Sequence, residues 1–354
     1  MNIVRVGIDI AKQNFQICAL NQANKVVFNK QVKRNTLLDH MRQLPAGTLV
    51  ALEACAGAHF WGREFEALGL KARLIPPQHV KAFTRVHKSD GGDALAIAEA
   101  ADRPQLHPVP IKSVEQQDLA MLMKLRDGVV VQRTRMVNTL HGFAHEYGVC
   151  LPIRSRARLR VSLMQALDDE KNSLSLTARG VLRDLWAEVL KLDERVLALL
   201  LQAQTLASRC EASAYKRLQT VPGIGPVVAT VFVGAVGSGA QFRCGRQLSA
   251  WTGLVPRQHG SGGKTQLLGI TKNGNRQLRT MLIHGARAVV TWIDRRNDAL
   301  ADWVKGMLAR RGFNRTVVAL ANKIARIAWI VLRTEASFDV NLAFRPRHSK
   351  ASSD

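Results

Sequence analysis

Four acidic residues at three places in the sequence have the residue type and spacing of a divalent-metal site. Asp9 interrupts an apolar segment, and Glu53 ends another. Asp90 and Asp93 are three residues apart at the start of an expected helix, so both can point to one side of it. Carboxylate oxygens are the ligands that Mg²⁺ and Mn²⁺ prefer, and such ions promote phosphodiester chemistry. We therefore expect one site that contains all four carboxylates.

Simpler explanations exist for single members of this set. Asp90 could be the N-cap of the expected helix, because Gly91 and Gly92 follow it. Glu53 could form an ion pair with a lysine. For any one residue these explanations are stronger, whereas the four residues together favour the metal site.

Ser261 is a candidate nucleophile in a glycine-rich segment that extends from Gly253 to Gly274. Glycines on both sides of Ser261 predict a flexible, exposed loop. Neighbouring cations could favour the alkoxide of this serine and neutralise the charge that develops on a phosphate under attack. A serine in a glycine loop is more often only part of a loop. The cations expected to contact nucleic acid are Arg257, Lys264, Lys272, Arg276 and Arg279.

The segment Val221–Pro226 places Gly223 and Gly225 between prolines, directly before an apolar helix. This pattern is typical of a helix-hairpin-helix motif. Its glycines allow the backbone to approach a phosphate, and the following helix offers free N–H groups. We expect both glycines to contact nucleic acid, with a plain turn as the alternative.

The overall charge favours a polyanionic partner. The chain of 354 residues has 51 Lys and Arg against 27 Asp and Glu, a formal net charge of +24. From Arg257 to Lys350 there are 18 basic and five acidic residues, so we expect this part to contact phosphates. The five cysteines are far apart, which argues against zinc and disulfides and favours a reducing cytoplasm. No signal peptide and no membrane-spanning run is evident.

The first 110 residues are expected to form an α/β layer with a mixed sheet. The expected strands cover residues 3–10, 14–20, 25–32, 48–53 and 71–75, and the expected helices cover 35–43, 58–69, 78–85 and 92–102. Prolines at 104, 108 and 110 mark a domain boundary.

Beyond these prolines the pattern becomes helical. Apolar residues from Leu182 to Leu199 repeat at heptad spacing, after an irregular basic stretch from Pro152 to about Arg160. The seam could dimerise the protein as a coiled-coil arm, or it could be one face of an ordinary helical domain. The C-terminal part is expected to contain helices 227–236, 275–292 and 314–333. The expected domains are 1–110, 111–212 and 213–344, followed by a polar tail, 345–354, expected to be disordered.

Several of these stretches together resemble one family, the DEDD transposases of the insertion-sequence-one-ten family, and within it the one-triple-one subgroup. The resemblance covers nearly the whole chain, in the expected order. Ser89 stands where the family more often has Thr, and it keeps the hydroxyl. The matching stretches are Gly7–Lys12, Leu52–Gly57, Lys88–Ala94, Val221–Pro226 and Gly253–Asn275.

The resemblance implies a RuvC-like (RNase H-fold) N-terminal domain, a helical coiled-coil arm and a mainly helical C-terminal transposase domain with a helix-hairpin-helix. It implies that Asp9, Glu53, Asp90 and Asp93 hold Mg²⁺ (or Mn²⁺) and that Ser261 forms a phosphoserine link to DNA. It further implies a bridge RNA that selects donor and target DNA, and a homo-oligomer (dimer or tetramer) whose protomers share the site. The protein would be cytoplasmic and associated with the nucleoid.

Two other functions are compatible with the same residues. A RuvC-like nuclease that resolves Holliday junctions would use the four carboxylates with water as the nucleophile, which would leave Ser261 without a purpose. A non-catalytic nucleic-acid scaffold would use only the helix-hairpin-helix and the basic helices, and would need no metal ion.

Overall fold

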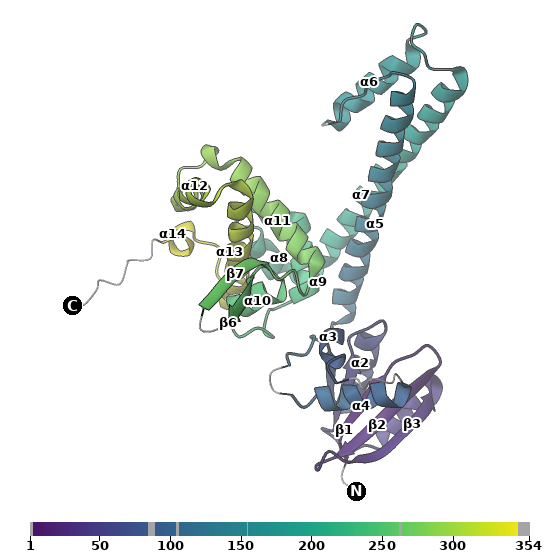
Figure 1. Cartoon of the computed structure of the whole chain (residues 1–354), viewed down its shortest axis with the longest axis vertical. Coiled ribbons are helices and arrows are strands. Elements are labelled where there is room, and N and C mark those ends of the chain that lie inside the picture. The colour runs from purple at the N-terminus through teal and green to yellow at the C-terminus, as the bar shows by residue number, and fades with distance from the viewer. Residues whose placement is uncertain (1–2, 84–88, 104–105, 154, 262–263, 346–354) are drawn as a thin grey trace, which may run out of the picture. The chain divides into compact units, whose positions relative to one another are not determined.

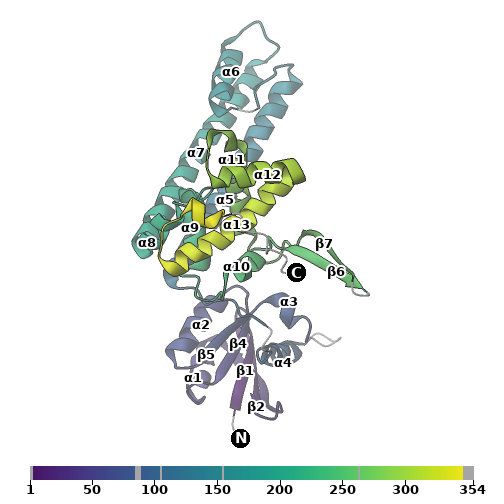
Figure 2. The same cartoon turned by 90° about the vertical axis from the view of Figure 1, so that its left-hand side faces the viewer.

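The computed structural model describes residues 3–83, 89–103, 106–153, 155–261 and 264–345. The chain forms two compact units, Met1–Val114 and Glu115–Asp354 (Figures 1 and 2). In the part of the chain that the structure describes, no helix is long and apolar enough to cross a membrane.

The first unit is built on a five-stranded mixed sheet, as the sequence predicts. The strand order is β3-β2-β1-β4-β5. β1 pairs with β2, and β2 with β3, in antiparallel orientation, whereas β1–β4 and β4–β5 are parallel. The strands are β1 (Ile3–Asp9), β2 (Asn14–Asn21), β3 (Val26–Lys33), β4 (Leu49–Glu53) and β5 (Lys71–Ile75).

Helices cover both faces of this sheet (Figure 2). On one face, alternate strand residues such as Val6 and Ile8 form a core with Leu37, Trp61 and Phe65 of the helices α1 and α2. On the other face, α4 packs its alanines against the sheet, and Val80 of α3 belongs to the same cluster. The helical elements are η1 (Arg34–Thr36), α1 (Leu37–Arg42), α2 (Ala58–Ala67), α3 (Pro77–Val80) and α4 (Asp90–Ala100).

The second unit begins with a long helical arm, in which α5 (Val114–Glu146) and α7 (Leu176–Cys210) run antiparallel (Figure 1). The shorter α6 (Arg156–Asp168) packs at the tip of the arm. Because it begins at Arg156, the irregular stretch that is expected to extend to about Arg160 ends earlier than predicted. The N-cap of α6 is Ser155, whose side chain accepts a hydrogen bond from the Arg158 N–H.

The heptad seam of α7 is buried inside its own chain. Leu182 and Val189 lie in one cluster with Leu140 of α5, and Val196 and Leu199 lie in a second cluster. The coiled coil is therefore intramolecular, and this seam is not available for dimerisation.

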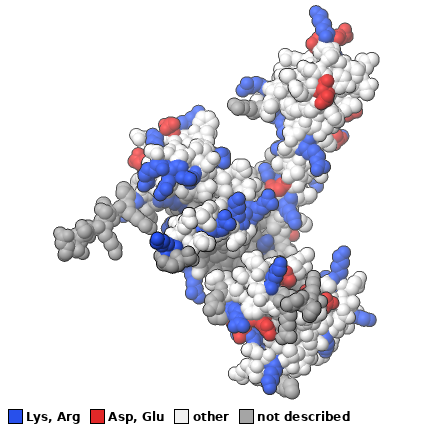
Figure 3. Space-filling model, in the orientation of Figure 1, with Lys and Arg blue, Asp and Glu red and all other residues white. Residues whose placement is uncertain are grey.

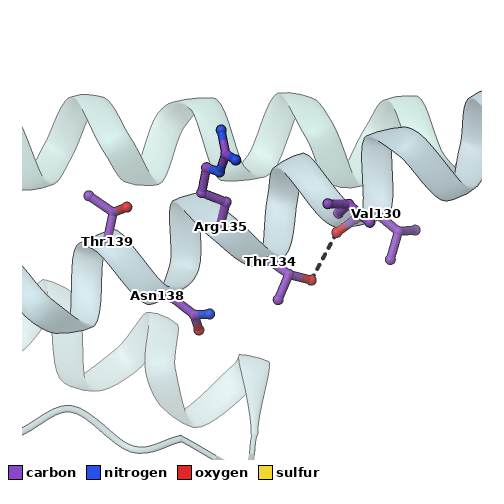
Figure 4. A pocket seen from close by; sticks show the side chains of 6 residues that line it. Val130, Thr134, Arg135, Asn138 and Thr139 are labelled. Carbon is purple, nitrogen blue, oxygen red and sulfur yellow. Dashed lines mark hydrogen bonds between the residues drawn. The ribbon is translucent and has the colours of Figure 1, made fainter.

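α5 also carries an open surface groove of about 650 Å³ (Figure 4). Val130, Thr134 and the 66% exposed Val131 are among the residues that line it. Within the groove, the Thr134 hydroxyl donates a hydrogen bond to the Val130 carbonyl at 2.8 Å.

The rest of the second unit is a helical domain with one projecting hairpin. The expected apolar and basic helices correspond to α9, α11 and α13. Residues 256–270, expected as part of a loop, instead form a two-stranded antiparallel hairpin. Of the polar tail, residues 346–354 lie outside the described residues. The elements are α8 (Ala212–Leu218), α9 (Pro226–Val236), α10 (Gly245–Trp251), β6 (Pro256–Ser261), β7 (Lys264–Ile270), α11 (Arg276–Thr291), η2 (Ile293–Arg295), α12 (Ala299–Arg311), α13 (Phe313–Thr334) and α14 (Val340–Ala343).

Candidate functional site

Asp9 and Glu53 lie at the carboxyl ends of two neighbouring parallel strands. Ile8 of β1 is in register with Leu52 of β4, so the next residue of each strand is one of the two acids. The sequence predicts this arrangement only if the two strands are neighbours, and they are. Both side chains are partly buried. Because side chains alternate along a strand, Asp9 and Glu53 share the face on which Gly7 and Ala51 lie, which is the face that α4 covers.

α4 approaches this face through a glycine. A Cβ placed on Gly7 would lie 2.2 Å from the carbonyl oxygen of Ala94 and 2.5 Å from the amide nitrogen of Ala98. No side chain fits in that space, so the helix backbone rests directly on β1, two residues before Asp9. Gly7 therefore sets how closely the helix that carries Asp90 and Asp93 can approach the strand that carries Asp9.

The direction of α4 brings its acidic first turn to the same end of the sheet as Asp9. Beyond the opposite end of the helix, Asp102 forms a 2.6 Å ion pair with Arg5, near the start of β1. The helix thus runs antiparallel to β1, and Asp90 and Asp93 in its first turn lie at the Asp9 end. The N-cap is Ser89, whose side chain accepts a hydrogen bond from the Gly92 N–H at 3.2 Å, so the alternative that Asp90 caps the helix is wrong.

The carboxylates create a local negative field in a strongly basic chain. Partial burial, followed by the charges of Glu53 and Asp9, raises the pKa of the Cys55 thiol. Asp93 is partly buried and Asp90 is exposed. Among the described residues, no three His, Cys, Asp or Glu side chains are already arranged to hold a metal ion. The donor set suits Mg²⁺ or Mn²⁺ chemically, because it consists of hard carboxylate oxygens that share one face of the sheet.

A chain of amide side chains ties the first turn of α4 to the sheet, and sequence reasoning misses it. Gln16 of β2 is the register partner of Asp9. The Gln16 amide donates to Asn29 Oδ1 at 2.7 Å, and Asn29 Nδ2 donates to the Gly91 carbonyl at 2.9 Å. Asn29 thus holds the backbone between the two aspartates of α4. The only sequence signal for this role is a polar residue in the middle of a β-strand.

The Val221–Pro226 segment forms the turn between two helices that are in contact, α8 and α9, as a helix-hairpin-helix requires. Gly223 has a φ of +88°, which strongly favours glycine. The turn is packed against α11, because a Cβ on Gly285 would lie 1.9 Å from the Gly223 carbonyl oxygen. Gly225 is exposed at the N-cap of α9, and this helix end has no side-chain cap.

The hairpin of β6 and β7 carries the candidate nucleophile at its tip. Ser261 is the last residue of β6 and is in register with Lys264, the first residue of β7. The strands on both sides of the tip are exposed, including Arg257 and Lys264. Lys272, between the hairpin and α11, and Arg276, the first residue of α11, are exposed as well. The structure therefore places these four cations where a polyanion can reach them, and the serine sits at the end of a two-stranded projection.

Arg279 differs from the other predicted cations. It is 8% exposed, and its Nη1 donates to the Thr252 and Asn273 carbonyls at 2.9 and 2.8 Å. Desolvation, and then the neighbouring Arg276, lower the pKa of this guanidinium. Arg279 joins the start of α11 to the two ends of the hairpin segment, and its guanidinium is turned to these carbonyls instead of to the surface.

Basic side chains also gather over the C-terminal helices. On the face shown in Figure 3, Lys and Arg side chains cluster over the part of the second unit that contains α11 to α13. The exposed cations of this region are Arg287, Arg295, Arg296, Lys305, Arg310, Arg311 and Arg315. A surface of this kind neutralises backbone phosphates.

Comparisons with known proteins find transposases. Residues 6–148 match a family model of DEDD transposases, described as "Transposase", and residues 215–301 match the model of the "Transposase IS116/IS110/IS902 family". The chain is 43% identical over 338 residues to a "Probable family 20 transposase" of Pseudomonas aeruginosa, covering 96% of this chain and 99% of that protein. It is 41% identical to the "Transposase for insertion sequence element IS1111A" of Coxiella burnetii, covering 94% of this chain and 90% of that protein.

These matches cover both compact units. The mixed sheet with its helices is the RNase H-like DEDD domain, and the mainly helical C-terminal part corresponds to the second family model. Relatives that match over nearly their full length favour an enzyme over a non-catalytic scaffold. The chain therefore belongs to the IS110 family of DEDD transposases, enzymes that cut and join DNA.

Proposed function

We propose that this transposase moves its insertion sequence by transesterification, with Asp9, Glu53, Asp90 and Asp93 as metal ligands and Ser261 as the nucleophile. The observation that carries the proposal is the placement of the acids. Two of them end adjacent parallel strands, and the first turn of α4 lies over the same face at the same end. Carboxylates from separate parts of the fold thus occur together at one edge of the sheet, where phosphodiester chemistry requires them.

The proposed reaction exchanges one phosphodiester bond for another. The Ser261 oxygen attacks the scissile phosphorus, a P–O bond to serine forms, and the P–O bond to one deoxyribose oxygen breaks. The serine proton ends on the released DNA hydroxyl. In the second step a DNA hydroxyl attacks the phosphoserine, rejoins the strand and returns the proton to Ser261. Bond energy is conserved in the protein–DNA link, so no ATP is consumed.

Bound Mg²⁺ or Mn²⁺ would stabilise the charge that develops on the phosphate. The protein groups have separate tasks. The carboxylates hold the ion, and Arg257 and Lys264 contact the phosphates on either side of the scissile bond. The amide chain from Gln16 through Asn29 to Gly91 holds the first turn of α4 close to β1. The carboxylates that would hold the ion are Asp9 and Glu53 at the strand ends and Asp90 and Asp93 in the first turn of α4.

The two halves of the proposed site belong to different compact units. The carboxylates lie in Met1–Val114 and Ser261 lies in Glu115–Asp354. In our proposal the hairpin of one protomer meets the carboxylates of another, within a homo-oligomer. The substrates are donor and target DNA, held in part by the backbone at Gly223 and Gly225 and by the exposed cations Lys272 and Arg276. The partner that chooses the sequences is a structured bridge RNA encoded by the element. The high positive charge supports a protein that holds both nucleic acids.

An adduct assay tests the nucleophile. Purified protein is incubated with end-labelled element DNA, guide RNA and Mg²⁺, and the products are separated under denaturing conditions. Wild-type protein should give a labelled adduct that resists SDS, and Ser261→Ala should give neither adduct nor cleavage. Cleavage by Ser261→Ala would instead favour the nuclease that uses water. Asp9→Asn should abolish both products, and omission of the guide RNA should abolish sequence-specific cleavage.

A further inference from the structure

A pocket beside the helix-hairpin-helix turn is outside the four-carboxylate site and outside the hairpin of Ser261. It has a volume of about 500 Å³, within the range of ~300–1,000 Å³ that is typical of small-ligand pockets. The turn before α9 supplies Gly223 and Gly225 to one side of the pocket. The last two turns of α11 and the segment that follows supply the other side, which ends in Trp292, Arg295 and Arg296.

Trp292 is unusual among the aromatic residues of this chain. All six tryptophans lie in the part of the chain that the structure describes, and Trp292, which is 55% exposed, is the one that stands among the exposed large hydrophobic residues. The Arg295 guanidinium lies over its ring at 4.0 Å from the centroid. An exposed indole is costly to keep in water. The stacked guanidinium holds it in place as a flat wall of the pocket.

The polar groups around this wall suit a phosphate. Arg295 and Arg296 are exposed at the mouth of the pocket. Arg296 also forms a hydrogen-bonded ion pair with Asp298, which orients its guanidinium. On the facing side, α9 starts at Pro226 without a side-chain cap, so its positive end is open to the pocket. An aromatic wall with two guanidinium groups and glycine backbone offers stacking for a base and charge for its phosphate.

We propose that this pocket binds one unpaired nucleotide, whose base stacks on Trp292 and whose phosphate is bound by Arg295 and Arg296. Base pairs inside a regular duplex are covered by their neighbours and cannot present a ring face to an indole. The ligand is therefore a nucleotide at a strand end, in a single strand or unstacked at a junction. Strand exchange exposes such nucleotides in DNA, and an RNA loop presents the same chemistry.

This inference rests on the proposed function only in that the substrate is nucleic acid. Three variants distinguish the contribution of the aromatic ring at position 292 from that of an apolar side chain of similar position and from that of the neighbouring positive charge. Trp292→Phe keeps an aromatic ring, Trp292→Leu keeps an apolar side chain without one, and Arg295→Ala removes the guanidinium beside it. Because Trp292 is 55% exposed and Arg295 is exposed, none of these changes removes core packing, and circular dichroism should show the wild-type helix content for each variant.

Binding is measured by fluorescence anisotropy with three labelled oligonucleotides of equal length: single-stranded DNA, single-stranded RNA and blunt duplex DNA. Trp292→Leu should weaken binding of a single strand by roughly 5- to 100-fold, which is the effect of one stacked base. Trp292→Phe should bind within about threefold of wild type, and duplex affinity should change less than about twofold. The strand that loses affinity identifies the source of the nucleotide. Quenching of tryptophan fluorescence by that strand should decrease in Trp292→Phe.

Two results would overturn the inference. One is a Trp292→Leu variant that binds both single strands as wild type does. The other is an equal loss for single strands and duplex, which would mean a general basic surface. The adduct at Ser261 is a separate measurement. If adducts form but the Trp292 variants bind single strands as wild type does, the stacking pocket is wrong and the serine mechanism stands. If the Trp292 variants lose single-strand affinity but no adduct forms, the serine mechanism is wrong and the stacking pocket stands.

Discussion

Gly7 of β1 lies so close to Ala94 of α4 that a Cβ on the glycine would be 2.2 Å from the Ala94 carbonyl oxygen. This contact fixes the separation between the strand that ends in Asp9 and the helix that begins with Asp90 and Asp93. The candidate metal site therefore depends on a residue that has no side chain and takes no part in the chemistry.

Gly7→Ala should displace α4 and reduce both stability and activity. The methyl group meets backbone atoms, which cannot rotate away, so we expect a loss of about 1–3 kcal/mol in the free energy of unfolding. DNA cleavage should fall further than the folded fraction does. Gly142→Ala in α5 is the control, because nothing lies within 4 Å of its Cβ position and alanine favours a helix. If the Gly7→Ala variant were as stable and as active as the wild-type protein, the close contact between α4 and β1 at Gly7 would not position the helix.

Asn29→Ala should raise the Mg²⁺ concentration needed for half-maximal cleavage by several-fold. The change removes the 2.9 Å hydrogen bond to the Gly91 carbonyl, so the first turn of α4 is held less firmly. Because this bond is partly exposed to water, the free energy of unfolding should fall by no more than about 1 kcal/mol. Gln31→Ala, at the next position on the same face of β3, is the control. An unchanged Mg²⁺ titration would exclude a positioning role for Asn29.

His59 should make the first unit less stable at acidic pH. Burial, and then the charges of Lys112 and Arg63, lower the pKa of this imidazole from 6.5 to about 4, and its Nδ1 accepts the Lys112 N–H at 3.2 Å. As the pH falls, His59 therefore binds a proton at a higher pH in the unfolded chain than in the folded protein. This difference costs the folded state nothing above pH 6.5, and the stability of the unit decreases as the pH falls from 6.5 toward 4.

Chemical denaturation between pH 7 and pH 4 checks this dependence. His59→Asn keeps a hydrogen-bond acceptor near the position of Nδ1 and removes the titrating group. Below pH 6.5 the wild-type protein should therefore lose more unfolding free energy than the variant does. A pH-independent difference would mean that His59 titrates normally.

The sequence predicts the first unit well because its signals are local. β1, β2 and β4 are short and largely apolar, all five strands have lengths typical of strands, and Gly57 and Pro76 mark turns beside them. The neighbouring positions of Asp9 and Glu53 require a pairing that the sequence allows but does not specify. Residues 256–270 are rich in glycine and polar residues, so the sequence predicts a loop, whereas the structure has a hairpin in which residues 256–260 and 264–269 are exposed. Without a buried face there is no apolar alternation to detect.

Other features depend on which surfaces meet in three dimensions. The heptad seam from Leu182 to Leu199 is evident in the sequence, but its partner, α5 of the same chain, is not. Arg279 has the same residue type as the exposed Arg276, and only the fold shows that it is buried. The pocket at Trp292 forms where the turn before α9 meets the end of α11, two segments about 70 residues apart that carry no joint sequence signal.

Arg257 and Lys264 should each contribute one phosphate contact. Replacement of either by alanine should weaken DNA binding regardless of sequence and lower the slope of log affinity against log salt by about 0.9. Titrations between low and moderate salt measure the slope. Lys191→Ala is the control, since Lys191 lies on α7 and its ammonium pairs with Glu188 at 2.8 Å. An unchanged slope in the hairpin variants would place the DNA elsewhere.

Mass spectrometry of the covalent intermediate tests most directly whether Ser261 and the carboxylates work together. Trypsin releases the segment from Gln258 to Lys264, in which Ser261 is the single hydroxyl side chain. After reaction with DNA, guide RNA and Mg²⁺ and nuclease trimming, this peptide should carry a nucleotide phosphate in wild-type protein and none in Asp9→Asn. Cleaved DNA with an unmodified peptide, or a nucleotide on any other peptide, would contradict the serine mechanism.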